Sequence, residues 1–327
     1  MRVLFLIQSR TLPSSRVRVL DLLPELERLG VSATVLPYGR ELRSKLRMLK
    51  ACSSFDVVVV QKKLPTILDG WLIRLRAKRL VFDFDDALYF RHEDKGGGVH
   101  PTSSRRFAAL LPRVDLVIAG NRHLAEEASK FAERVEVLPS SVHVKGVPRR
   151  VHDEKSQPVV IGWVGGTNNL GQAKLLAPVL ERIATKVTIE LRVISGEALS
   201  LEGVPCSFLP WSAESQHEAL STLDIGVMPL PDSPHARGKC GYKALQYMAA
   251  GVPAVVSDVG VNREIVGHRE CGLVASSIPD FEAHLTELAE GAELRRELGE
   301  RGRKRAAELY AVEVVAGQLH DLLVSIA

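Results

Sequence analysis

Short apolar runs alternate with longer stretches of helical periodicity along nearly the whole chain, and this alternation restricts the fold more than any other feature of the sequence. Runs rich in Val, Ile and Leu are typical of parallel strands buried on both faces, and the stretches between them are typical of crossover helices. Apolar residues at helical spacing predict a helix over 17–29, which Gly30 ends. In the first half we expect six strands, enough for a complete doubly wound sheet, at 3–7, 33–36, 57–60, 80–84, 116–119 and 135–138.

Residues 145–158 interrupt the alternation with two prolines, many charges and no periodicity, a composition typical of a linker. A last apolar-striped helix is expected over 312–326 and must bury one face. Between this linker and the last helix the alternation restarts, with strands expected at 159–164, 190–194, 207–209, 225–229, 254–256 and 273–274.

The sequence therefore predicts an α/β protein with two doubly wound, Rossmann-like parallel-sheet domains. We expect an N-terminal domain at 1–150, a C-terminal domain at 151–310 and a final helix at 311–327 that is free to cross back onto the first domain. A short linker would bring the carboxyl ends of both sheets around one central cleft, where open α/β sheets bind ligands.

The composition excludes several other classes of protein. With 46% hydrophobic and 25% charged residues, the chain falls among soluble globular proteins and outside the disordered and fibrous classes. The four cysteines form no CxxC pair and have no metal-ligand spacing to histidine, so we expect no disulfide framework, no structural zinc and a cytoplasmic location. The first apolar run is too short for a signal peptide, and none reaches the ~18 residues of a membrane span.

The charge is unevenly distributed. Residues 1–155 contain 28 Lys and Arg against 18 Asp and Glu, whereas residues 156–327 contain 15 against 21. The basic residues lack interleaved aromatic residues, which disfavours nucleic acid as a partner. Two interpretations stay open: an ordinary solvated helix face, or peripheral contact with the acidic inner face of a membrane.

Two polar turns in the second half are suited to an anion. A basic, glycine-containing loop that begins at Arg237 opens a predicted helix that starts near residue 239, and a second turn at 257–262 opens another. Helix starts offer unpaired backbone N–H groups and a positive dipole end. Lys239 and Lys243 are four residues apart, so they are expected on one face of the helix or its first turn, where two cations suit a diphosphate. The alternative is that both lysines are simply solvated.

Residues 243–264 resemble the nucleotide-sugar-binding half of family 4 glycosyltransferases of the GT-B fold, whose helix reads roughly Glu-Ala-Met-Ala-x-Gly-x-Pro-Val-Val before a Gly-rich turn and a Glu. Here the corresponding stretch is Gln246-Tyr-Met-Ala-Ala-Gly-Val-Pro-Ala-Val-Val256. Further segments that resemble the family lie earlier in the chain, in the order that the family has them, at 81–89, 115–121, 161–166 and 224–230. The resemblance implies transfer of a sugar, with retention of anomeric configuration, from a nucleotide-diphosphate sugar to a glycan, lipid-linked or small-molecule acceptor. It also implies that domain 151–310 binds the nucleotide sugar and that domain 1–150 binds the acceptor. It implies no cofactor besides the donor.

The chain departs from the family at two positions. The paired glutamates of the family, separated by seven residues, would fall at Gly238 and Gln246. Gln246 can still hydrogen-bond the ribose hydroxyl that the second glutamate binds. The Arg and Lys that many members carry after the first strand of this half are absent from 162–170.

The missing positive charge is therefore predicted to come from Lys239, Lys243 and Arg237, while Gly165 and Gly166 let the backbone approach the phosphates. With Lys239 and Lys243 as the catalytic cations, the donor site implied by the resemblance consists of Gly165, Gly166, Arg237, Gly241, Tyr242, Gln246, Gly260, Val261 and Glu264.

Candidate acceptor residues lie in the first half. The segment Asp83-Phe-Asp-Asp86 contains the DxD pattern with which another glycosyltransferase fold holds a divalent metal. A metal site is disfavoured here, because two sheets are predicted and the loops suited to phosphate lie in the second. Asp85 and Asp86 are predicted to recognise sugar or acceptor hydroxyls, or else to cap the following turn. Ser15 and Arg16 are candidate acceptor contacts, although a serine at a helix start is ordinarily a cap. Asn121 is expected to cap a helix.

Other enzyme classes lack their motifs, since the chain has no GxSxG, no GxxxxGK[ST] and no GxGxxG after its first strand. Two alternatives to a glycosyltransferase stay open. Because both family carboxylates are missing, the chain could be a noncatalytic sugar-nucleotide- or glycan-binding subunit. It could also be an epimerase or hydrolase of nucleotide sugars with the same fold.

Overall fold

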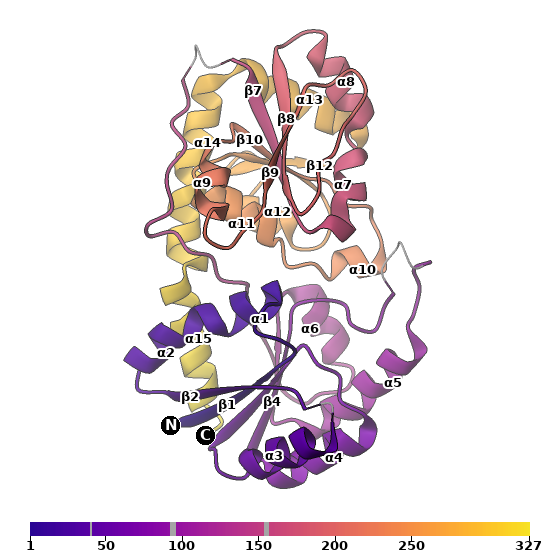
Figure 1. Cartoon of the computed structure of the whole chain (residues 1–327), viewed down its shortest axis with the longest axis vertical. Helices are drawn as coiled ribbons and strands as arrows, with labels where there is room; N and C mark the ends of the chain where they lie inside the picture. Colours follow the sequence, from indigo (N-terminus) through magenta and orange to yellow (C-terminus); the bar gives the residue numbers. More distant parts are fainter. Residues whose placement is uncertain (40, 92–95, 154–156) are drawn as a thin grey trace. The chain divides into compact units, whose positions relative to one another are not determined.

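The computed structural model describes residues 1–39, 41–91, 96–153 and 157–327, which form two compact units (Figure 1). Unit 1 comprises Met1–Ser141, Ser233–Cys240 and Val312–Ala327, and unit 2 comprises Val142–Asp232 and Gly241–Ala311. These bounds differ from the expected domains in that unit 2 begins at Val142 and a short segment from its middle, Ser233–Cys240, belongs to unit 1.

Unit 1 contains a six-stranded sheet in the order β2-β1-β3-β4-β5-β6, and all neighbouring strands are parallel. Its strands are β1 (Arg2–Ile7), β2 (Ser32–Pro37), β3 (Val57–Gln61), β4 (Arg79–Phe84), β5 (Leu116–Ala119) and β6 (Val135–Val137). The order reverses direction at β1, as in doubly wound folds, so the predicted fold class is confirmed for this half.

Helices cover both faces of this sheet, because successive residues of a strand point to opposite faces. Val3, Phe5 and Ile7 of β1 pack with one group of helices, and Leu4 and Leu6 with the other. The first group is a 3-10 turn (Leu20–Leu22), which follows the short helix α1 (Pro13–Arg18), together with α2 (Leu23–Arg28) and α15 (Val312–Val324). The second is α3 (Leu42–Cys52), α4 (Ile67–Arg76), α5 (Pro101–Leu110) with its 3-10 extension (Leu111–Arg113), and α6 (Arg122–Ala128).

The single helix predicted over 17–29 is wrong, because the chain there is divided into α1, a 3-10 turn and α2. Val19 leaves the helical region with φ −132°. Pro24 accounts for the interruption, since it has no N–H to donate to the carbonyl four residues earlier. The predicted stop is correct: Gly30 has φ +82°, the left-handed conformation that commonly ends a helix.

Unit 2 repeats the architecture, with six parallel strands in the order β12-β11-β10-β7-β8-β9. The strands are β7 (Val159–Val164), β8 (Ile189–Ser195), β9 (Cys206–Pro210), β10 (Ile225–Met228), β11 (Ala254–Ser257) and β12 (Gly272–Ala275). Neighbouring strands β7 and β10 lie where the order reverses, and their carboxyl ends are therefore where a ligand is expected. Each predicted strand is present, within two residues of its expected bounds.

The helices of unit 2 bury the sheet, and Trp163 of β7 is fully buried in the core they form. They are a 3-10 turn (Thr167–Asn169), α7 (Leu170–Lys174), α8 (Ala177–Ala184), α9 (Gln216–Ser221), α11 (Tyr242–Ala249), α12 (Asn262–Val266), α13 (Ile278–Glu290), α14 (Ala292–Arg305) and a π-helical turn (Ala306–Tyr310). In the described part of the chain, no helix combines the length and the apolar character that crossing a bilayer needs.

The predicted linker is attached to unit 2 over its described part, and Glu154, Lys155 and Ser156 lie outside the described residues. Arg150 donates to Oδ1 of Asp224 from Nε (3.1 Å) and Nη2 (2.8 Å). Asp224, at the amino end of β10, also accepts from the backbone N–H of Val160 at 2.9 Å. This buried carboxylate fastens the linker to the amino edge of the sheet.

Candidate functional site

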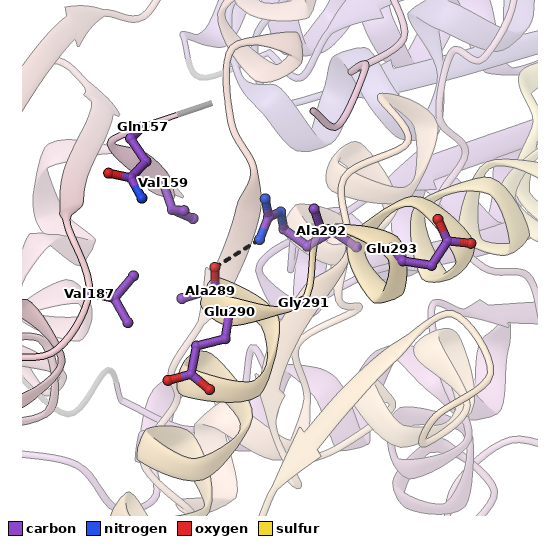
Figure 2. A pocket seen from close by; sticks show the side chains of 9 residues that line it. Gln157, Val159, Val187, Ala289, Glu290, Gly291, Ala292 and Glu293 are labelled. Atoms are coloured by element: carbon purple, nitrogen blue, oxygen red, sulfur yellow. Dashed lines mark hydrogen bonds between the residues drawn. The ribbon is translucent and has the colours of Figure 1, made fainter. Parts of the chain in front are cut away.

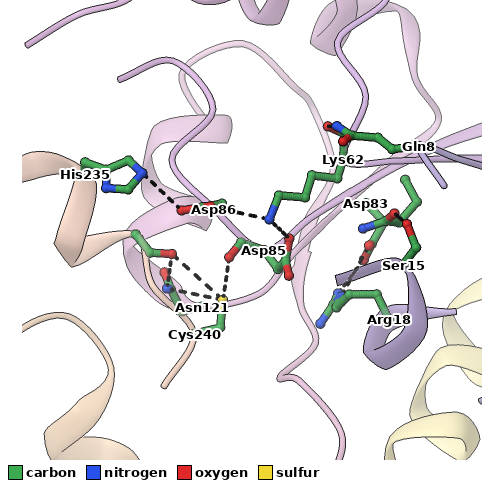
Figure 3. Close-up of polar contacts among 12 residues, drawn as sticks. Gln8, Ser15, Arg18, Lys62, Asp83, Asp85, Asp86, Asn121, His235 and Cys240 are labelled. Carbon is green, nitrogen blue, oxygen red and sulfur yellow. Dashed lines mark hydrogen bonds and ion pairs between the residues drawn. The ribbon is translucent and has the colours of Figure 1, made fainter. Parts of the chain in front are cut away.

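In unit 1, polar side chains gather where β3 and β4 end (Figure 3). The Lys62 ammonium, directly after β3, lies 3.0 Å from Asp85 Oδ1 and 3.4 Å from Asp86 Oδ2. Burial alone would lower the pKa of Lys62, but the two carboxylates raise it. Burial would raise the pKa of Asp86, but Lys62, Lys239 and His235 lower it. Asp86 is therefore held as a carboxylate, and both aspartates lie beside a fixed cation.

Asp83, the first residue of the DxD pattern, has a different partner. Its carboxylate pairs with the guanidinium of Arg18, which is 3% exposed. Arg18 also donates to the carbonyls of Leu138 (2.6 Å) and Pro139 (3.0 Å). Burial alone would lower the pKa of Arg18, but Asp83 raises it. Among the described residues, no group of three or more His, Cys, Asp and Glu is arranged to hold a metal ion.

The segment Ser233–Cys240 packs on unit 1 although unit 2 flanks it in sequence. Asn121 Nδ2 donates to the carbonyls of Gly238 and Lys239, both at 3.1 Å, and its Oδ1 caps α6 by accepting from Leu124 N–H, as predicted. Cys240 Sγ donates to the Asp85 carbonyl at 3.3 Å (Figure 3). The segment begins with a short helix, α10 (Pro234–Arg237). Its His235 places Nε2 3.6 Å from Asp86 Oδ1.

Gly238, the position of the first family glutamate, has no room for a side chain. A Cβ there would lie 2.6 Å from the Ala87 Cβ and 2.9 Å from the Ala87 backbone nitrogen. Contacts this short are not found in real structures, so the backbone would have to shift. The local packing in unit 1 thus explains the absence of that carboxylate.

The prediction that Ser15 caps a helix start is wrong. The helix begins at Pro13 with Leu12 as N-cap, so Ser15 lies inside α1. Its fully buried hydroxyl donates to Gln61 Oε1 at 3.0 Å. Arg16 Nε lies 4.0 Å from Asp21 Oδ2, and its side chain is one-fifth exposed.

In unit 2, Lys243 lies beside the glycine turn that follows β7. A Cβ on Gly165 would be 2.6 Å from the Trp163 ring and 3.1 Å from Lys243 Cε, so the absence of a side chain leaves room for both the ring and the lysine beside the backbone. The ammonium lies 5.1 Å from the centre of the Trp163 ring and donates to Gln172 Oε1 at 3.1 Å. Gly166 is exposed and starts the short helical turn that leads into α7. A neutral amide and an aromatic face thus hold this cation at the carboxyl end of β7.

The helix that follows the basic loop is α11, and it starts at Tyr242 rather than near residue 239. Gly241 is its N-cap with φ +64°, and a Cβ there would lie 2.1 Å from Ile265 Cδ1. Lys243 is in the first turn, whereas Lys239 precedes the helix and belongs with unit 1. The predicted common helical face for the two lysines is therefore wrong.

Gln246, the position of the second family glutamate, lies on α11 and is 6% exposed. Its Nε2 is 3.4 Å from Oε1 of Gln216, at the start of α9. This contact does not use the amide oxygen of Gln246, and an amide oxygen can accept a hydrogen bond from a hydroxyl.

The second predicted turn surrounds a groove of about 280 Å³ at the carboxyl ends of β10, β11 and β12, lined among others by Leu230, Ser257, Asp258 and Ser276. Gly260 is exposed with φ +59°, and Val261 is the N-cap of α12. Glu264 has an exposed side chain, and its backbone carbonyl accepts from Arg305 at 2.8 Å.

A larger groove of about 500 Å³ lies at the other end of the sheet (Figure 2). Its lining includes Gln157, Val159 and Val187, which precede or start strands. Because open parallel sheets bind ligands at the carboxyl ends of their strands, this groove is not the expected donor site. The buried Arg295 at its edge donates to the last carbonyls of α13, Leu288 O (2.5 Å) and Ala289 O (3.0 Å).

Sequence reasoning missed several residues that the structure brings to the candidate sites, notably Lys62, His235 and Gln172. Lys62 directly follows a strand, so the rule that selected Asp85 could have selected it too. His235 and Gln172 carry no such signal, since only the folded chain shows what lies near them.

Comparison with known proteins gives one family match. Residues 158–291 match the family described as glycosyl transferases group 1. This range runs from the start of β7 to the end of α13 and contains both predicted anion-binding turns. No curated protein has a significant match to the sequence.

Many solved structures share the fold. Sucrose-phosphate synthase from Thermosynechococcus elongatus is 16% identical with a TM-score of 0.74, and the alignment covers 100% of both chains. HepE from Anabaena, in complex with UDP and glucose, is 16% identical with a TM-score of 0.77, covering 99% of this chain and 100% of that one. A glycosyltransferase from Rickettsia africae is 10% identical with a TM-score of 0.75, covering 99% and 98%. These likenesses confirm the predicted GT-B fold of two Rossmann-like domains.

Proposed function

We propose that this chain, a glycosyltransferase whose residues 158–291 form a glycosyl transferases group 1 domain, moves a sugar from a nucleotide-diphosphate sugar to an acceptor hydroxyl with retention of anomeric configuration. The observation that carries the donor assignment is the placement of Lys243 along the Gly165 backbone, in the first turn of α11 and at the carboxyl end of β7. UDP is the proposed nucleotide, because the similarly folded HepE has been solved with UDP and with UDP-glucose.

The donor is assigned to unit 2. Gly166 presents a backbone N–H group, and α11 presents its positive end behind Gly241 and Tyr242. Gly165 donates its own N–H to the Ile194 carbonyl at 3.0 Å, and its lack of a side chain lets a phosphate approach the backbone. Gln246 is assigned to the ribose, as the resemblance to family 4 implies. Gly260, Val261 and Glu264 form the second turn of the proposed donor site, and Lys239 and Arg237 stay proposed as further cations for the diphosphate.

The acceptor is assigned to unit 1. Asp85 and Asp86 offer carboxylate oxygens to sugar or acceptor hydroxyls, and Lys62 fixes their positions. Arg16 is the proposed polar contact beside them. Ser15 acts through Gln61, because its hydroxyl is fully buried.

In the proposed reaction, the bond between the anomeric carbon and the diphosphate oxygen breaks, and its electron pair leaves with the diphosphate. The acceptor oxygen forms the new bond to the oxocarbenium-like carbon, and its proton passes to a phosphate oxygen. The chain provides no covalent nucleophile. Its contribution is a fixed cation and oriented N–H groups that stabilise the charge developing on the leaving group.

The proposed location is cytoplasmic and peripheral to an acidic membrane, which the excess of basic residues in 1–155 supports. The proposed sugar transfer does not depend on this location.

The test is turnover with UDP-, GDP- and dTDP-sugars, each with and without a panel of glycan, lipid-linked and small-molecule acceptors, with NMR of the anomeric proton in the product. Acceptor-dependent transfer that keeps the donor's configuration supports the proposal, and inversion removes the retaining mechanism. Binding with no turnover would instead identify a noncatalytic subunit. Products formed equally without acceptor would identify an epimerase or hydrolase.

A further inference from the structure

Two neighbouring helices of unit 1, α3 and α4, carry an unusual mixture of exposed side chains. Figure 1 shows them side by side on one face of the sheet, and an ion pair between Lys45 Nζ and Asp69 Oδ2 (2.9 Å) joins them. Met48 and Cys52 of α3 and Ile73 of α4 point into the core of unit 1. The remaining faces are exposed.

The exposed faces are largely apolar. On α4 the exposed apolar residues recur at spacings of three and four, so they form one stripe, and Leu42 and Leu46 of α3 have the same spacing. Leu42 is 74% exposed and Leu68 is 63% exposed. Single exposed leucines are ordinary, but a group on two adjacent helices marks an interaction surface. This α3–α4 surface consists of Leu42, Leu46, Ile67, Leu68, Trp71 and Leu75.

Basic side chains surround these apolar residues. Arg43, Arg47 and Lys50 of α3 and Arg76 of α4 are exposed. The one acidic residue within either helix, Asp69, is buried and paired with Lys45. A merely solvated helix face would be polar throughout, so the abundance of leucine disfavours that interpretation.

We propose that the α3–α4 surface docks this protein onto an anionic lipid bilayer. Leucine and tryptophan side chains can enter the boundary between headgroups and acyl chains, while arginine and lysine contact anionic headgroups. A second copy of the chain fits the surface less well, because a two-fold interface would place the same cations of both copies against each other. The surface therefore combines the two signals, apolar area and positive charge, that stable peripheral binding needs.

The test is co-sedimentation of the full-length protein with vesicles of phosphatidylcholine, with and without phosphatidylglycerol, at low and high salt. Binding is expected only with the anionic lipid and is expected to weaken as salt rises. Each basic residue near such a surface contributes about fivefold to binding. Arg43→Gln with Arg47→Gln should therefore weaken binding about 25-fold, and Leu68→Ser with Trp71→Ser on the order of 100-fold.

Matched controls change similar residues elsewhere. Val324→Ser, on α15, removes an apolar side chain that is 51% exposed. Arg301→Gln with Lys304→Gln, on α14, changes the net charge as much as the basic double variant does. The controls should bind vesicles as the wild type does, and every variant should keep its affinity for UDP and its melting temperature.

Absence of vesicle binding, equal binding to neutral vesicles, or unchanged binding by both double variants would overturn the proposal. A second outcome would also overturn it: the protein does not bind vesicles, is a dimer in solution, and becomes monomeric in the Leu68→Ser, Trp71→Ser double variant. The α3–α4 surface would then be an interface with a second copy. The experiment uses no sugar donor, so its failure is distinguishable from failure of the proposed glycosyl transfer.

Discussion

At the scale of single residues, Lys243 has the surroundings that best fit a leaving diphosphate. Its hydrogen bond to Gln172 and its place over the Trp163 ring hold the ammonium in position. Preorganised cations stabilise developing charge without reorganising during the reaction.

Lys243→Ala should lower turnover by on the order of 10²–10³, the usual effect of removing one such electrostatic contact. It should also weaken binding of UDP. The measurements are kcat and KM for the sugar donor and calorimetric titration with UDP. Lys174→Ala, an exposed lysine at the end of α7, is the matched control and should leave all three unchanged. Wild-type turnover and UDP affinity in Lys243→Ala would contradict the assignment.

Asp224 is the residue on which the linker's attachment depends. Its side chain is 1% exposed, and Arg150, its partner, is 20% exposed. Asp224→Asn leaves the largely buried guanidinium of Arg150 without its carboxylate and should cost about 3–5 kcal/mol of unfolding free energy. Asp56→Asn removes one partner of the exposed pair with Lys78 and should change the melting temperature little. Equal melting temperatures for wild type and Asp224→Asn would refute this role.

The same carboxylate gives a pH dependence. Burial would raise the pKa of Asp224, but hydrogen bonds from His152 and Val160 and the charge of Arg150 lower it below the ordinary value. A carboxylate with a lowered folded pKa stabilises the protein fully above its unfolded pKa of about 4 and loses that effect as pH falls through the folded value. The stability difference between wild type and Asp224→Asn should therefore be constant from neutral pH to about pH 5 and shrink below about pH 4. A gap that widens at low pH would be inconsistent with this.

At the scale of elements, the segment Ser233–Cys240 decides which family features the chain can keep. Asn121 holds two of its carbonyls and Cys240 bonds to the Asp85 carbonyl, so the backbone at Gly238 lies against Ala87. A glycine is the residue that this close approach allows.

Restoring the first family glutamate by Gly238→Glu should therefore destabilise the protein by about 1–3 kcal/mol and should not tighten donor binding. Gly238→Ala should destabilise it by a similar amount, because the Cβ alone makes the short contacts. Gly171→Ala, where a Cβ meets nothing within 4 Å, is the control in thermal melts. A stable Gly238→Glu variant with higher donor affinity would show that the glycine is not required by packing.

Elements with a strong local pattern could be predicted from the sequence. Most strands carry a β-branched or leucine-rich run between polar turns, which is the pattern typical of buried parallel strands. The single helix predicted over 17–29 is wrong because the helical spacing of hydrophobic residues continues through Pro24, whereas the backbone hydrogen bonds of a helix are interrupted there. The predicted start of α11 near residue 239 is too early. The spacing of Lys239 and Lys243 is compatible with a helix, but Gly241, with its positive φ, is the N-cap.

At the scale of the whole molecule, the two-sheet architecture follows from the alternation of elements, but the assignment of Ser233–Cys240 to unit 1 does not. The segment is flanked on both sides by unit 2, and its attachment depends on contacts with Asn121 and Asp85, more than a hundred residues earlier in the chain. Local patterns carry no information on such pairings. For the same reason Lys62 and His235 became visible as neighbours of Asp86 only in the folded chain.

The central claim is that the diphosphate of the donor binds in unit 2, between the glycine turn after β7 and the start of α11. The most direct measurement is a crystal structure of the protein with UDP. The account predicts phosphate oxygens within hydrogen-bonding distance of Lys243 Nζ and of the backbone N–H group of Gly166. A diphosphate bound in unit 1, or bound in unit 2 away from Lys243, would contradict it.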